Sequence, residues 1–125
     1  MAKKFRTHLM FEGRAQEAMD LYVSLLDSAK IGEVQRYENG TITQAEFSLG
    51  DHDFIFIDSP TGHDFTFTPS TSIFVDCESE DELVKLFEEL SKDGKVYMPL
   101  ADYGFSQQFG WITDRFGVSW QLNLP

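Results

Sequence analysis

The chain has 125 residues, with 21 acidic and 10 basic side chains and a formal net charge of −11. This length is typical of one domain, so residues 1–125 are predicted to form a single domain. The negative charge argues against a nucleic-acid or anionic-membrane partner, because either would repel the protein. Cys77 is the only cysteine, which suits a reducing compartment. No apolar run approaches the roughly 20 residues of a membrane span, and the basic start is not followed by the apolar core of a signal peptide. We therefore expect a cytoplasmic protein.

Residues 1–58 predict a strand, a helix and three further strands. Residues 5–11 alternate in polarity as a strand does, and apolar residues recur at helical spacing between residues 14 and 27. Gly32 is expected to break the chain after this helix. Strands are predicted at 33–37, 41–49 and 54–58, with a hairpin turn at Asn39-Gly40.

Residues 59–70 are predicted to be a linker, because they contain Pro60, Gly62 and Pro69 and little regular pattern. A second module, residues 71–125, begins with a strand at 71–76. Its helix starts at Ser79, which forms a capping-box spacing with Glu82, and Gly94 is expected at the helix C-cap. Residues 95–98 follow as a short strand that Pro99 is expected to end.

The last predicted feature is a hairpin in residues 109–124. Asp114-Arg115-Phe116-Gly117 separates two apolar runs and is typical of a tight turn. In the second run the apolar residues Val118, Trp120, Leu122 and Leu124 alternate with the polar residues Ser119, Gln121 and Asn123. Such a polar second face lies against either water or a polar pocket.

This repeated order of strand, helix and three strands resembles the vicinal oxygen chelate superfamily, the glyoxalase and bleomycin-resistance fold. Several motifs resemble its PhnB-like subgroup, often labelled 3-demethylubiquinone-9 3-methyltransferase: Leu9 to Gly13, Ala15, Glu17-Ala18-Met19, Tyr22, Ser72 to Val75, Met98-Pro99-Leu100, and Trp111 with Asp114 to Gln121. The resemblance implies an α+β fold, with tandem βαβββ modules forming a curved mixed sheet around a cavity, and a homodimer. No glycine-rich loop follows a strand and opens a helix, so no nucleotide-type cofactor is expected.

Metal-dependent members of the superfamily take ligands from four strands, typically His, Glu, His and Glu. The resemblance places the first position at Thr7 or His8, and alternation favours His8 for the cavity. The second falls between Phe56 and Asp58, the third between Ser70 and Ser72, and the fourth at Gln121. Because a carboxamide binds a divalent ion more weakly than a carboxylate does, and no His stands at the third position, we expect no metal. The expected ligand-binding residues are His8, Phe56, Ser72, Trp111 and Gln121, with no cofactor.

Three functions agree with this sequence. The first is binding of a small organic molecule in the cavity without a metal, in which His8 acts as a base and Gln121 donates hydrogen bonds if a proton transfer occurs. The second is sequestration of a cationic drug, as in bleomycin-resistance proteins, which the acidic charge favours. The third is a metal-dependent enzyme whose ligands lie one residue from the positions above.

Overall fold

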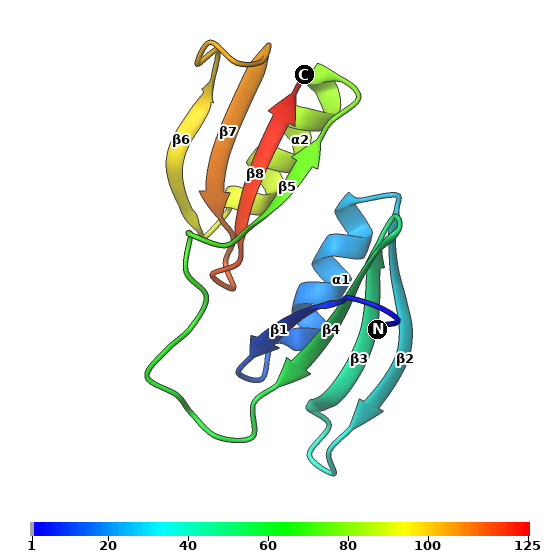
Figure 1. Ribbon diagram of the computed structural model, residues 1–125. Helices are drawn as coiled ribbons and strands as arrows, with labels where there is room; N and C mark the ends of the chain where they lie inside the picture. Colours follow the sequence, from blue (N-terminus) through cyan, green and yellow to red (C-terminus); the bar gives the residue numbers. More distant parts are fainter. Residues whose placement is uncertain (1) are drawn as a thin grey trace. The chain divides into compact units, whose positions relative to one another are not determined.

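The computed structural model describes residues 2–125, and in this range it has two helices and eight strands (Figure 1). The chain divides into two compact units, unit 1 at Met1–Thr66 and unit 2 at Phe67–Pro125. Each unit is one βαβββ module with its helix against one face of a four-stranded mixed sheet. The α+β class and the tandem modules predicted from the sequence are confirmed. The boundary between the units falls inside the range 59–70 given to the linker.

Unit 1 is built around sheet A, in which the strands lie in the order β1-β4-β3-β2. Its elements are β1 (Thr7–Phe11), α1 (Ala15–Leu25), β2 (Ala29–Arg36), β3 (Ile42–Leu49) and β4 (His52–Asp58). The β1 and β4 strands are parallel, and the other pairs are antiparallel. Tyr22 of α1 contacts the rings of Phe47 and Phe56, so these rings mark the face of sheet A that packs on the helix. We call the opposite face the open face of sheet A.

Unit 2 has the same plan around sheet B, in the order β5-β8-β7-β6. Its elements are β5 (Ser72–Asp76), α2 (Glu80–Ser91), β6 (Lys95–Ala101), β7 (Gln108–Thr113) and β8 (Ser119–Leu124). Trp120, Leu122 and Ile112 are fully buried, as expected for the side that carries the core. A side chain at Gly110 would meet Phe87 of α2, which identifies this as the helix side. The opposite side, with Trp111 and Gln121, is the open face of sheet B.

The turn between β7 and β8 forms as predicted and is organised by a buried carboxylate. Asp114 Oδ1 accepts hydrogen bonds from the backbone N–H groups of Phe116 and Val118, and Oδ2 accepts one from Trp120 Nε1. Gly117 has φ of +94°, a conformation that glycine adopts without strain. The aspartate therefore joins the turn to the largest core side chain of unit 2.

Three expectations about chain breaks are wrong. Gly32 lies inside β2, where its missing side chain leaves room for Glu46 on β3, 3.0 Å from the position of a Cβ. Gly94 is not the left-handed cap of α2, because Asp93 takes that conformation with φ of +59°; a side chain at Gly94 would collide with the carbonyl oxygen of Thr113. Pro99 lies within β6, an edge strand, where a missing backbone donor is tolerated.

The capping box of α2 differs from its prediction in one bond. Ser79 Oγ accepts from the Glu82 backbone N–H, as expected. Glu82 Oε1, however, accepts from the backbone N–H of Glu78 rather than from that of Ser79.

Neither helix in residues 2–125 has the length and apolar character needed to span a bilayer.

Candidate functional site

A hydrogen-bonded cluster on the open face of sheet B brings together three of the five predicted site residues. Trp111 Nε1 donates to Ser119 Oγ at 2.9 Å, and Ser119 Oγ lies 2.6 Å from Ser72 Oγ. Gln121 Nε2 donates to Ser72 Oγ at 3.2 Å. The cluster follows from strand pairing, because Ser72 pairs with Ser119 and Trp111 pairs with Gln121. We name these four residues the Gln121 cluster.

The carbonyl oxygen of Pro69 completes the Gln121 cluster as its final acceptor. It lies 3.3 Å from Ser72 Oγ and 3.5 Å from Ser119 Oγ. A hydroxyl has one proton, so one serine donates to the other and the remaining proton goes to Pro69. The Trp111 N–H and one Gln121 N–H are therefore consumed inside the protein.

The Gln121 amide keeps free groups for a ligand. Its Nε2 points toward Ser72, which leaves Oε1 and the second N–H. Within residues 2–125, Oε1 accepts no hydrogen bond. The Gln121 side chain is half-buried and is held by Ser72, so its Oε1 and second N–H lie at the solvent boundary in a fixed position. Gln121 therefore presents an acceptor and a donor side by side.

Aromatic rings surround Gln121 on the same face. Phe74 on β5 is its cross-strand partner on one side and Trp111 on β7 on the other. The Tyr97 ring lies 5.4 Å from that of Trp111, and Phe109 lies 6.1 Å from Phe74. Phe74 is 53% exposed and Tyr97 40%, so both rings are accessible within unit 2. The face combines a polar centre with apolar walls, as small-molecule sites do.

The polar character continues toward the end of β8. Asn123 Nδ2 donates to Asp76 Oδ1 at 2.9 Å. Asn123 Oδ1 is buried and has no hydrogen-bond partner among residues 2–125. A buried acceptor in this condition is expected to take a donor from water or from a ligand. Sequence reasoning placed Asn123 on the polar face but not in the site, since the missing partner is a property of the folded structure.

His8 and Phe56 lie in unit 1 on opposite faces of sheet A. His8 is exposed on the open face and pairs with Ile55 of β4. Phe56 is fully buried on the helix side, where its ring packs against Phe11 and Phe47 at 5.2 and 4.7 Å. The alternation of the strand gives Phe56 to the core, so its side chain is not available to a ligand on the open face.

Asp58, the carboxylate weighed as a metal ligand, is committed to the backbone. It is 2% exposed; Oδ1 accepts from the N–H groups of Gly13 and Ala15, and Oδ2 from that of Ile42. These bonds fix the start of α1 and the start of β3 against the end of β4. Asp58 is thus a structural residue on the helix side.

The side chains at the four expected metal positions do not fit a metal site. Asp58 is occupied by three N–H donors, and Ser72 and Gln121 bond to each other, which leaves His8 as the one typical ligand. Within either unit, over residues 2–125, no three His, Cys, Asp or Glu side chains are grouped as metal ligands. Neutral oxygen donors of the Gln and Ser type suit a divalent cation poorly without carboxylates.

Known proteins resemble this chain over nearly its whole length. The family model described as 3-demethylubiquinone-9 3-methyltransferase matches residues 3–123. The structure of the PhnB protein from Bacillus cereus is 46% identical, covers 98% of this chain and 100% of that chain, and has a TM-score of 0.94. Protein YjdN from Escherichia coli is 22% identical, covering 94% of this chain and 92% of YjdN. A glyoxylase/bleomycin resistance protein/dioxygenase domain from a Frankia species shares the fold, with a TM-score of 0.69, 17% identity and coverage of 99% and 92%.

Proposed function

The chain belongs to the 3-demethylubiquinone-9 3-methyltransferase family, within the vicinal oxygen chelate superfamily, and on this premise we propose that it binds a small organic molecule on the open face of sheet B without a metal. The observation that carries the proposal is the Gln121 amide, held by Ser72 among accessible aromatic rings. We do not assign methyl transfer. The two strand-to-helix turns, at Glu12-Gly13-Arg14 and Cys77-Glu78-Ser79, lack the glycine-rich pattern of a nucleotide-type site.

The donors and acceptors of this face indicate the ligand's chemistry. Gln121 offers Oε1 and one N–H, which together complement a carboxamide or lactam group. Asn123 Oδ1 needs a donor. Phe74 and Tyr97 offer ring faces for stacking against a flat ligand. A planar molecule with an amide-type edge therefore fits the face best.

Native mass spectrometry of the purified protein tests this proposal. We expect the wild-type protein to bind an organic molecule, either one that co-purifies with it or an added aromatic amide. The Gln121→Leu variant should lack this bound mass. Zn, Ni or Mn should add no stoichiometric mass. A tightly held metal in the wild-type protein, or a ligand retained equally by Gln121→Leu, would contradict the proposal.

A second candidate, sequestration of a cationic drug, is favoured by one specific arrangement. Phe74 and Asp76 are both exposed, two residues apart on β5, so a ring and a carboxylate share the open face. A cation is attracted to both. A thermal-shift screen with cationic glycopeptides decides this, since the absence of stabilisation by any of them would count against it.

The proposal includes a homodimer in the cytoplasm. The edge strands of sheet B, β5 and β6, carry the exposed side chains Phe74, Val96 and Tyr97. Exposed edges with apolar residues favour pairing with another chain. The native mass spectrometry proposed above tests this, because a homodimer has twice the mass of the 14.3 kDa chain. The cytoplasmic location is supported by the single cysteine, Cys77.

A further inference from the structure

A hollow on the open face of sheet A gathers basic side chains in an otherwise acidic protein. It has a volume of about 300 Å³, near the lower end of small-molecule sites. Lys4, Arg6 and Lys30 line it together with Asp53 and Glu46, so its net charge is positive by one, whereas the chain carries −11. The hollow lies entirely in unit 1 and shares no residue with the Gln121 cluster.

Strand pairing places these groups in one row across the sheet. Lys30 on β2 pairs with Ser48 on β3, and Ser48 pairs with Asp53 on β4. Arg6 precedes Thr7, whose partner is Phe54, and therefore lies beside Asp53 at the start of β1. The row is thus Arg6, Asp53, Ser48, Lys30, with a cation at each end.

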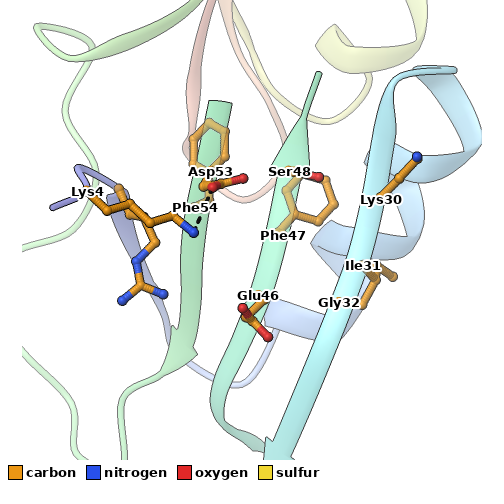
Figure 2. Close-up of a pocket in the computed structure, with 10 residues that line it drawn as sticks. Lys4, Lys30, Ile31, Gly32, Glu46, Phe47, Ser48, Asp53 and Phe54 are labelled. Atoms are coloured by element: carbon orange, nitrogen blue, oxygen red, sulfur yellow. Dashed lines mark ion pairs between the residues drawn. The ribbon is translucent and has the colours of Figure 1, made fainter. Parts of the chain in front are cut away.

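The one carboxylate in this row is already neutralised. Lys4 Nζ lies 3.0 Å from Asp53 Oδ2, and Figure 2 shows this ion pair beside β4, with Ser48 and Lys30 on the strands beyond it. Among residues 2–125, Arg6 and Lys30 have no carboxylate within ion-pair distance, and Ser48 Oγ has no hydrogen-bond partner. Two cations and one hydroxyl therefore face the hollow unused.

Glu46 limits where an anion fits. It lies two residues from Ser48 on β3, roughly 7 Å along the strand, and leans over Gly32. An anionic group must therefore lie at the Lys30–Ser48 end of the hollow, away from the Glu46 carboxylate. Ile31 also lines the hollow, but it pairs with Phe47, so its side chain lies on the helix side of sheet A.

We propose that this hollow binds a small organic anion, with its carboxylate or phosphate group held by Lys30 and Ser48. Arg6 lies three strands from Lys30, about 14 Å across the row, and adds only to the positive field of the hollow. Charge-assisted hydrogen bonds from Lys and Arg to such groups are among the strongest that proteins make. The Lys4–Asp53 pair screens the middle of the row, so removal of the Asp53 charge strengthens the site. This site goes beyond the proposed function, because it uses other residues and another ligand chemistry.

The test is a titration of the full chain with benzoate and, separately, phenyl phosphate, followed by backbone amide NMR shifts. We expect saturable shifts at Lys30 and Ser48, and the tighter of the two probes identifies the anionic group. Lys30→Gln should weaken binding by about tenfold or more, because a hydrogen bond to a charged group is lost. Asp53→Asn should tighten it by freeing Lys4.

Two controls separate this site from a general charge effect and from the proposed function. Lys85→Gln removes the same charge from an exposed position of α2 and should leave binding unchanged. Gln121→Leu should also leave it unchanged. Absence of saturable shifts, equal weakening by Lys85→Gln and Lys30→Gln, or loss of binding in Gln121→Leu alone would overturn the proposal.

Discussion

The indole N–H of Trp111 donates to Ser119 Oγ at 2.9 Å, although the direct cross-strand partner of Trp111 is Gln121. The bond therefore runs diagonally across the β7–β8 hairpin, within reach of a large side chain. It fixes the indole beside Gln121 and gives Ser119 a donor. Ser119, which is 1% exposed, thus holds Trp111 directly and is linked to Gln121 only through Ser72.

Ser119→Ala is expected to destabilise unit 2. The substitution leaves the Trp111 N–H without its acceptor and removes a partner from Ser72, so we expect the free energy of unfolding to fall by about 1–3 kcal/mol. Urea denaturation measures it. Ser24→Ala is the matched control, because its hydroxyl bonds to the Leu21 carbonyl on an exposed helix surface and should cost little. Equal effects of the two changes would contradict the account of the cluster.

Asp114→Asn is expected to weaken the last hairpin. Asp114 accepts three hydrogen bonds in a 2% exposed position, and an amide nitrogen in place of one oxygen faces an N–H donor instead of accepting from it. We expect a loss of about 2–3 kcal/mol, measured by denaturant unfolding with Trp120 fluorescence. Asp102→Asn is the control, since Asp102 accepts one bond, from Gly104 N–H, in an exposed turn. A loss below that of the control would rule out the buried carboxylate as the organiser of the turn.

Gly110→Ala is expected to disturb the packing of α2 on sheet B. A Cβ at this position would lie 2.8 Å from Leu100 Cδ2 and 2.9 Å from the Phe87 ring, so these two side chains must move. Overpacking of this kind costs about 1–3 kcal/mol. Gly62→Ala is the control, because no atom lies within 4 Å of its added carbon. Thermal unfolding should show a lower Tm for Gly110→Ala and no loss for Gly62→Ala.

Cys77 is expected to react slowly with alkylating reagents. Burial, and after it the nearby Glu82 carboxylate, raises the pKa of the thiol from 9.0 to about 11. At pH 8 the thiolate fraction falls about 100-fold, because the pKa is two units higher. Iodoacetamide labelling should therefore be far slower in the native protein than in urea, and its rate should rise with pH up to about 11.

The same shift predicts a loss of stability at high pH. The folded pKa of Cys77 is above that of the unfolded chain, so its stabilising contribution is complete below pH 9 and is lost as the pH rises toward 11.

Glu82→Gln keeps an oxygen that accepts from Glu78 N–H but removes the charge, and it should speed labelling of Cys77. Native and denatured proteins labelled at one rate, or a Glu82→Gln variant slower than wild type, would contradict this assignment.

Local patterns predicted the modules and the polar face of β8. Alternation from Val118 to Leu124 assigned Trp120 to the core and Gln121 to the open face, since side-chain period fixes the face of a strand. The same alternation, applied to β4, assigns Phe56 to the core, yet the positional match to metal ligands led to its inclusion in the site. The resemblance identified the strand but not the side to which each residue points.

The features that sequence reasoning missed depend on contacts between distant residues. Gly32 and Gly94 have the composition of chain breaks, but the neighbours that require a glycine are Glu46 and Thr113, which only pairing of strands or loops brings near. Lys30 and Ser48 are 18 positions apart in the sequence and meet only in the β2–β3 register. Such contacts have no local signal, so neither the hollow nor its unused cations are predictable from the sequence.

The most direct test of metal-free ligand binding at the Gln121 cluster uses the two tryptophan indole N–H signals in an NMR titration with benzamide. Trp111 lies at the proposed site, whereas Trp120 donates to Asp114 in the core and serves as an internal reference. In the presence of a chelator we predict that the Trp111 signal shifts and saturates, that the Trp120 signal stays in place, and that Gln121→Leu abolishes the shift. A Trp111 signal unmoved by benzamide, or moved equally in wild type and Gln121→Leu, would contradict the central claim.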